Sequence, residues 1–259
     1  MDPKRISTGI AGLDLLLNGG YIKGRIYLLT GEAGTGKTIA CLQFLVNALR
    51  LGERAVYVTV DERPVEILES AESFDWDLQR HIQEKNLVVL DASPYFGGRS
   101  GSAGEKGVDP QKIVADLGNY ARRLGATILI IDPLTPLISP AEASGSAREQ
   151  ARSLIQLIQS QLNITTIFTA HRAEGTAESF TSGIEQFLAS GVLVFKTTMT
   201  HGKLERTLTT KKMRGTAVEP NDHRFVIRQN DGIVLADGPA VITAELPMFE
   251  LFESAKRES

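Results

Sequence analysis

Short runs of apolar and β-branched residues alternate with longer stretches of helical periodicity along the first two thirds of the chain. The apolar runs carry few polar positions, which is typical of strands buried on both faces of a sheet. Alternating strands and helices predict an α/β fold, in which helices cover both faces of a mainly parallel central sheet. The predicted strands are 25–30, 55–60, 86–91, 127–132 and 165–169, and the predicted helices are 39–49, a segment after Pro64, 110–124 and 147–161.

The pattern changes after residue 190, where short β-type runs with turn residues between them predict antiparallel strands. The two predicted C-terminal β-hairpins pair 191–196 with 204–211 and 224–228 with 232–235. Segments 93–109 and 139–145 are rich in small residues and are predicted to be loops. We expect a single domain over residues 1–240 and a C-terminal tail over residues 241–259.

Composition and charge exclude several classes of protein. The 259 residues are 42% hydrophobic and 23% charged, as in an ordinary soluble globular domain with a well-buried core. The net charge of −3 provides no overall basic field for nucleic acid. Cys41 is the single cysteine, so an intrachain disulfide is excluded, and we expect a core residue in a cytoplasmic protein. No apolar run approaches the ~20 residues that cross a bilayer, and no secretory signal follows Met1.

The segment 31–38 is a complete G-x-x-x-x-G-K-[ST] phosphate-binding loop. It lies between a predicted strand and a predicted helix, which is the context that such a loop requires. Its glycines allow backbone N–H groups to close around phosphate, and the helix N-terminus adds partial positive charge. We expect Lys37 to reach the β- and γ-phosphates and the Thr38 hydroxyl to hold Mg²⁺. The residues expected to bind ATP here are Gly31, Glu32, Ala33, Gly34, Thr35, Gly36, Lys37 and Thr38.

Acidic residues follow two of the predicted strands. Asp132 ends the apolar strand 127–132, and a carboxylate at that position can hold Mg²⁺ through water. Asp61 and Glu62 follow the strand 55–60, and the carboxyl ends of strands in an α/β sheet face the ligand crevice. Hydrolysis needs a group that orients or deprotonates water, and we expect Glu62 in that role with Asp61 second. The alternative for this pair is a structural charge near the start of the helix at Pro64.

A basic segment, 211–216, lies in the late β region, far in sequence from the glycine loop. It is either a charged turn between edge strands or a basic finger directed at a phosphate, in the same subunit or in a neighbour. An arginine placed on the charge that develops on the γ-phosphate can raise the rate by orders of magnitude. Lys212 and Arg214 are therefore candidate catalytic and ATP-binding residues.

Together these motifs resemble the KaiC-like branch of the RecA superfamily of P-loop ATPases. The resemblance covers residues 5–238 and begins with a lead-in, Arg-Ile-Ser-Thr-Gly-Ile-Ala-Gly-Leu-Asp, at 5–14. It continues through the glycine loop, the segment 59–64, the strand that ends at Asp132 and the sequence Lys-Met-Arg-Gly-Thr at 212–216. It implies a RecA-like fold, ATP hydrolysis with Mg²⁺, and a homo-oligomer, a hexameric ring, with ATP held between subunits. In such a ring Lys212 and Arg214 would act on the neighbour's nucleotide.

The chain departs from the KaiC pattern at three places. The family usually has two glutamates where Asp61 and Glu62 stand, which favours Glu62 as the residue that activates water. Pro133 replaces a serine that often follows the metal-binding Asp in the family. Gln186 and Phe187 occupy the positions at which the second domain of KaiC carries a phosphorylated Ser-Thr pair. The resemblance is therefore to the hydrolytic first domain of KaiC more than to the autokinase domain.

Two other functions stay open at the level of sequence. A RecA-like recombinase would bind DNA through the loops at 136–147 and 172–186, but these hold no cluster of Lys or Arg. Phosphotransfer could use a nearby hydroxyl such as that of Thr181, Ser182 or Ser190. We expect nucleic acid and membranes not to be partners, and regulatory proteins to be possible ones. The glycine- and serine-rich stretch 96–108 has no assigned role.

Overall fold

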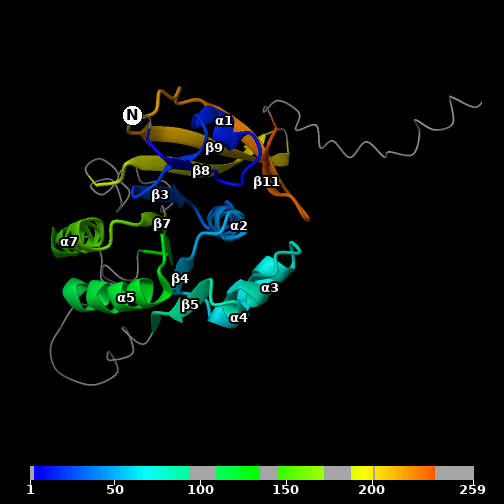
Figure 1. Ribbon diagram of the computed structural model, residues 1–259. Coiled ribbons are helices and arrows are strands. Elements are labelled where there is room, and N and C mark those ends of the chain that lie inside the picture. Colours follow the sequence, from blue (N-terminus) through cyan, green and yellow to red (C-terminus); the bar gives the residue numbers. More distant parts are fainter. Residues whose placement is uncertain (1–2, 94–108, 135–144, 172–187, 201, 237–259) are drawn as a thin grey trace, which may run out of the picture.

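The computed structural model describes residues 3–93, 109–134, 145–171, 188–200 and 202–236 (Figure 1). A nine-stranded mixed sheet forms the centre, with the strand order β11-β10-β9-β8-β3-β7-β6-β4-β5. The strands are β3 (Ile26–Gly31), β4 (Ala55–Thr59), β5 (Leu87–Asp91), β6 (Ile128–Asp132), β7 (Thr165–His171), β8 (Gly191–Thr200), β9 (Lys203–Met213), β10 (Asp222–Arg228) and β11 (Gly232–Leu235). The helices are α1 (Leu13–Leu16), α2 (Lys37–Arg50), α3 (Pro64–Glu72), α4 (Leu78–Gln83), α5 (Pro110–Leu124) and α7 (Gly145–Gln161).

Strands β8, β3, β7, β6, β4 and β5 pair in parallel, whereas β9, β10 and β11 add to the edge of β8 as antiparallel strands. This arrangement confirms the predicted α/β fold class. All five predicted parallel strands form at the expected places. The first hairpin is longer than predicted, because β8 and β9 continue the pairing to Thr200 and Lys203. The basic segment therefore begins inside β9, which ends only at Met213.

The apolar strands divide their side chains between two cores, one on each face of the sheet. Alternate residues of β3 illustrate the division, since Tyr27 and Leu29 belong to one core and Ile26 and Leu28 to the other. Helices α2, α3 and α4 cover the first face, and α5 and α7 cover the second, as Figure 1 shows on opposite sides of the sheet. Because a strand alternates its side chains between faces, both must be apolar when both are covered.

Two buried side chains illustrate the packing of the first core, and for Cys41 the expected core position is confirmed. Cys41 is fully buried within α2, on the face that packs against the sheet. Trp76 is 4% exposed and stacks on Phe74 with ring centroids 4.8 Å apart. A Cβ on Gly232 would meet the Trp76 ring at 2.7 Å, so the indole fixes the start of β11 against the helical layer. Trp76 therefore acts as a packing anchor.

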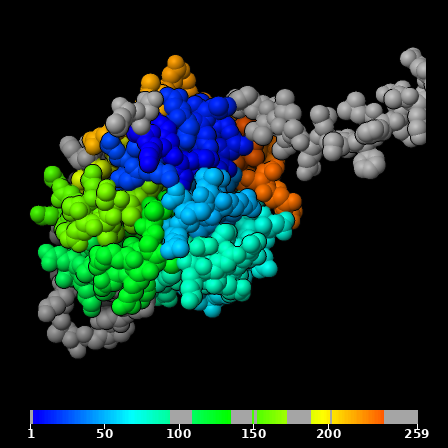
Figure 2. All heavy atoms as spheres, viewed as in Figure 1, coloured from blue at the N-terminus to red at the C-terminus, as the bar shows by residue number. Residues whose placement is uncertain are grey.

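The N-terminal segment adds structure that the sequence pattern did not predict. Strands β1 (Arg5–Ile6) and β2 (Tyr21–Ile22) form a small antiparallel ribbon with the short helix α1 between them. Ala11 bridges to Val234 of β11, and Figure 2 shows the N-terminal segment (dark blue) lying against the late strands (orange). The start of the domain is thus packed against its end.

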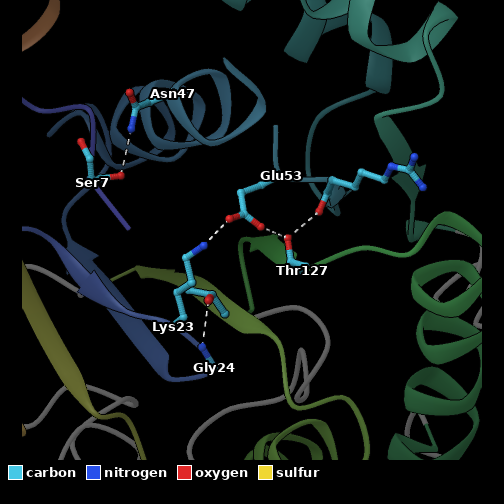
Figure 3. A network of polar contacts seen from close by, with 8 residues as sticks. Ser7, Lys23, Gly24, Asn47, Glu53 and Thr127 are labelled. Carbon is cyan, nitrogen blue, oxygen red and sulfur yellow. Dashed lines mark hydrogen bonds and ion pairs between the residues drawn. The ribbon is translucent and has the colours of Figure 1, made fainter. Parts of the chain in front are cut away.

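A polar network joins this segment to the amino ends of the central strands (Figure 3). Glu53, which follows α2, forms an ion pair with Lys23 and accepts a hydrogen bond from the Thr127 hydroxyl. The Asn47 side chain donates to the carbonyl of Ser7 at 3.0 Å. Partial burial of Glu53 opposes ionisation, but Lys23 and Thr127 lower the pKa of the Glu53 carboxyl. The network fixes the β2–β3 turn relative to α2 and β6.

None of the helices within the described ranges is long and apolar enough to span a bilayer. The predicted loop 93–109 falls almost wholly outside the described residues, as does the predicted tail 241–259. The candidate DNA-binding loops lie largely or wholly outside them, and Thr181, Ser182, Gln186 and Phe187 lie outside them as well.

Candidate functional site

The glycine loop connects the end of β3 to the start of α2, as its sequence context predicted. Gly34 and Gly36 have φ of 74° and 105°, in the left-handed region that disfavours side chains. Gly31 has a different constraint, because a Cβ there would lie 2.3 Å from the carbonyl oxygen of Phe195. The turn therefore requires glycine where the backbone must curl and where it passes β8.

Lys37 lies at the first turn of α2 with 6% of its surface exposed. Its Nζ donates to the backbone carbonyl oxygens of Gly31 at 3.0 Å and Glu32 at 2.7 Å. Burial lowers the pKa of the Lys37 ammonium, while the nearby charge of Asp132 acts in the opposite direction. The ammonium is thus held over the loop with backbone partners that a phosphate could replace.

A cavity of about 430 Å³ opens beside this loop and is lined by residues of β6, β7, β9 and β10, by the first turn of α2, and by the segments that follow β3, β4 and β6. Its volume suits a nucleotide-sized ligand. The predicted residues Ala33, Gly34, Gly36, Lys37, Thr38, Asp61, Glu62 and Asp132 all line it, together with Ile39, Pro133, His171, Arg206 and Ile227. Gly31, Glu32 and Thr35 belong to the loop but do not line the cavity; the Thr35 hydroxyl donates to the carbonyl of Glu32 at 2.9 Å.

Asp61 and Glu62 are exposed residues that follow β4 at the edge of the cavity. The Thr59 hydroxyl donates to the carbonyl of Glu62 at 2.7 Å and fixes the turn into α3. Partial burial and the charge of Asp132 raise the pKa of the Glu62 carboxyl. The pKa of Asp61 is also raised, chiefly by partial burial, although His171 acts to lower it. Carboxyls with raised pKa values accept protons more readily, which suits a group that activates water.

Asp132 ends β6 with 7% of its surface exposed. Its carboxylate accepts hydrogen bonds from the Tyr57 and Thr169 hydroxyls, the first at 2.8 Å. Asp132 and Thr38 both line the cavity and both offer oxygen ligands, the type that Mg²⁺ prefers. Among the described residues no cluster of three or more His, Cys, Asp or Glu could hold a metal ion by itself. These residues fit a Mg²⁺ that takes its other ligands from phosphate and water.

His171 ends β7 and lies in strand register with Gly31. It lines the cavity near Lys37 and Asp61. Burial and the charge of Lys37 lower the pKa of the imidazole, whereas Asp61 and Asp132 act to raise it. His171 is therefore a cavity residue that lies close to the groups expected to bind phosphate and metal.

Arg206 of β9 is a cavity residue that sequence reasoning missed. Its Nε atom is buried and has no hydrogen-bond partner among the described residues. A buried guanidinium donor without an acceptor is costly, so the side chain is suited to receive an acceptor from a ligand. In the sequence Arg206 is one of several polar residues in the segment 204–211, and no motif marks it as a ligand-binding residue.

Lys212 and Arg214 do not line this cavity. The strand register shows why, because Met213 pairs with Gly191, which pairs in turn with Tyr27 near the start of β3. The loop begins at the other end of β3, where Gly31 pairs with Phe195. Four residues of strand between these levels correspond to about 13 Å. The structure therefore does not bring the two basic residues to the loop of their own chain.

The turn that follows β9 is held by Arg5 of the N-terminal ribbon. One guanidinium nitrogen of Arg5 donates to the Gly215 carbonyl at 3.1 Å and to the Thr216 hydroxyl at 3.0 Å. The other donates to the carbonyls of Leu17 and Gly20, both at 3.0 Å. The pKa of the Lys212 ammonium is lowered by partial burial and by the charge of Arg214. The two cations are thus kept close together on an anchored turn.

Comparison with known proteins identifies relatives of this arrangement. The protein-family model "ATPase: KaiC" matches residues 6–239. The chain is 33% identical over 232 residues to the circadian clock protein KaiC3 of Synechocystis and 35% identical over 231 residues to the circadian clock oscillator protein KaiC of Nostoc. These matches cover 90% and 89% of the chain but only 45% and 44% of the relatives, so the chain spans about half their length.

A solved structure agrees with these sequence comparisons. The crystal structure of a KaiC-like protein from the hyperthermophilic archaeon Pyrococcus horikoshii superposes with a TM-score of 0.76 at 29% sequence identity. The match covers 90% of this chain and 99% of that one. The similarity therefore extends through a whole chain of comparable size, and not only through the glycine loop.

Proposed function

This chain belongs to the KaiC family of P-loop ATPases, and from that premise we propose that it is a Mg²⁺-dependent ATPase that works as a ring oligomer. In this proposal ATP lies between subunits, the ring is a hexamer, and its turnover acts on regulatory protein partners in the cytoplasm. The observation that carries the proposal is a single cavity lined by Lys37, Thr38, Asp132 and Glu62. These side chains provide the phosphate, metal and water-activating groups of ATP hydrolysis.

Each residue has a defined part in the proposed reaction. The loop N–H groups and Lys37 bind the β- and γ-phosphates, and Thr38 and Asp132 would hold a Mg²⁺, which would supply positive charge against the phosphate oxygens. Glu62 orients the attacking water and takes its proton as the bond from the water oxygen to the γ-phosphorus forms, with Asp61 beside it. The bond between the γ-phosphorus and the β–γ bridging oxygen breaks at the same centre, and ADP leaves with that oxygen. Charge that develops on the γ-phosphate is met by Lys37 in the same subunit and by Lys212 and Arg214 from the next.

The position of Lys212 and Arg214 supports a shared site. They lie at the other end of β3 from the loop, so in an isolated chain these two cations do not reach a phosphate bound at that loop. An interface in which the 212–216 segment of one subunit contacts the loop of the next would bring them to it. Such a head-to-tail contact gives a closed ring when the rotation that relates neighbouring subunits is a whole fraction of a full turn.

Light scattering after size exclusion, with and without ATP and Mg²⁺, tests the proposal directly. We expect assembly into about six chains with nucleotide, the size of the proposed ring, together with Mg²⁺-dependent phosphate release. A chain that stays monomeric in both conditions would contradict the ring, and absence of hydrolysis by an assembled ring would contradict the ATPase.

Substitution of Arg206 with alanine is expected to weaken nucleotide binding about tenfold, in line with a hydrogen bond to a charged group. The physical reason is the loss of the buried donor that the cavity leaves without an acceptor. A fluorescent ATP analogue titrated into the protein measures the effect. Arg224→Ala is the matched control, because Arg224 is exposed on the adjacent strand and forms an ion pair with Glu205. Equal affinities for the two variants would contradict the assignment of Arg206.

A further inference from the structure

The carboxylate of Asp132 is held by hydroxyl groups from two neighbouring strands. Tyr57 Oη donates to Asp132 Oδ2 at 2.8 Å, and the Thr169 hydroxyl donates to Oδ1. Tyr57 lies on β4 and Thr169 on β7, the strands that flank β6 in the sheet. Each carboxylate oxygen therefore has one fixed donor, from opposite sides.

This arrangement follows from the register of the parallel sheet. Tyr57 is opposite Ile130, and Thr59 is opposite Asp132, so Tyr57 and Asp132 project from the same face two residues apart along the strands. The long phenol ring spans this offset, which a shorter hydroxyl at position 57 could not do. Thr169 follows Phe168, the partner of Ile131, and so lies beside Asp132 on the other flank.

Tyr57 is completely buried, and so is Thr169. A buried tyrosine hydroxyl needs a partner, and a carboxylate is the strongest acceptor within reach. A phenol hydroxyl can donate one hydrogen bond, whereas an ionised carboxylate only accepts, so Tyr57 is the donor of this pair. The contact is therefore a charge-assisted hydrogen bond from a fully buried hydroxyl to a largely buried carboxylate.

The two hydroxyls leave part of the carboxylate available. An ionised carboxylate accepts about four hydrogen bonds, and the pair from Tyr57 and Thr169 uses one on each oxygen. Acceptor capacity therefore remains for a ligand in the cavity that Asp132 lines. Hydrogen bonds to the far side of a metal-binding group fix its orientation and tune its affinity.

We propose that Tyr57 is a positioning residue for the Mg²⁺ site, with Thr169 as the second member of a hydroxyl clamp on Asp132. The clamp fixes the carboxylate in the rotamer that faces the cavity, so that a hydrated Mg²⁺ meets a preoriented acceptor. This inference rests on the proposed function, in which Asp132 holds the metal. It adds a determinant of metal affinity that lies on β4, outside the loop and strand motifs of the family.

The test is the Mg²⁺ concentration that half-saturates binding of a fluorescent ATP analogue by the full chain. In Tyr57→Phe, which removes one oxygen atom, we expect this concentration to rise about tenfold, the lower end of effects seen for residues that orient metal ligands. Binding of the analogue without Mg²⁺, in the presence of a chelator, is expected to stay unchanged. Tyr27→Phe is the matched control, because Tyr27 is equally buried and its hydroxyl bonds only to the backbone of Ile22.

Further variants separate the clamp from simple stabilisation. Thr169→Val is expected to shift the half-saturating Mg²⁺ concentration in the same direction, and Thr169→Ser to restore it. These two variants also give the answer should Tyr57→Phe fail to fold. An unchanged Mg²⁺ requirement in Tyr57→Phe, alongside a lost response in Asp132→Asn, would overturn the clamp and leave the metal site intact. An unchanged response in Asp132→Asn would instead overturn the placement of Mg²⁺, and the clamp with it.

Discussion

Glu62→Gln is expected to reduce ATP hydrolysis by at least two orders of magnitude, the scale of a lost general base. The amide keeps the size of the side chain but cannot take a proton from water. Glu62 is exposed at the rim of the cavity, and among the described residues its side chain forms no hydrogen bond to the glycine loop, so ATP and Mg²⁺ should still bind. Steady-state phosphate release measures the loss, and a fluorescent ATP analogue measures the retained affinity.

Two neighbouring substitutions make this result specific. Glu66→Gln is the same chemical change one helical turn further on, where the carboxylate bonds to Arg63 and does not line the cavity. It should leave hydrolysis near the wild-type rate. Asp61→Asn should cost less than Glu62→Gln, because we assign Asp61 the second role. A larger loss in Asp61→Asn would reverse the two assignments.

Mixed rings of two inactive variants are expected to regain activity if the site is shared between subunits. A Glu62→Gln subunit keeps its basic turn, and an Arg214→Ala subunit keeps its own loop and Glu62. One complete site forms wherever the basic turn of a Glu62→Gln subunit contacts the glycine loop of an Arg214→Ala subunit. In a random one-to-one mixture roughly a quarter of the interfaces have this order, so about a quarter of the wild-type rate should return in a head-to-tail ring.

The control for this experiment pairs two variants that damage the same half of the site. Mixtures of Glu62→Gln with Lys37→Ala should stay inactive, because every interface then contains one defective loop or one defective acid. Light scattering must show that Arg214→Ala alone still assembles. Failure of the first mixture to exceed its parents, in rings shown to contain both variants, would contradict action between subunits.

Much of the fold could be predicted because its strands are covered on both faces. Runs such as 127–132 have no polar face, and this is possible only in the interior of a layered α/β domain. The small ribbon β1–β2 was missed because each strand has only two residues, too few for any periodicity. The extent of β9 was missed because its first residues, from Lys203, are polar or exposed and provide no buried apolar pattern.

Some residues of the candidate site could also be predicted from the sequence, and others could not. Its loop and acids were predictable because phosphate and Mg²⁺ demand fixed residue types at fixed places after a strand. Arg206 and Tyr57 were not, since each reaches the site only through strand order. Arg206 requires β9 to follow β8 beside β3, and Tyr57 requires β4 to lie next to β6. These neighbours are set by tertiary packing, and a local pattern does not contain them.

The bonds of Arg5 to the 215–216 turn join residues about 210 positions apart in the chain. Contacts of such long range are slow to close, because the entropy of the intervening chain must be lost first. During synthesis the loop, Asp61, Glu62 and Asp132 can come together before the basic turn has left the ribosome. The loop and the acids therefore leave the ribosome before the basic turn, whereas Ile227, which also lines the cavity, leaves it after that turn. A nascent chain would thus have its phosphate-binding residues in place before the cavity around them is complete.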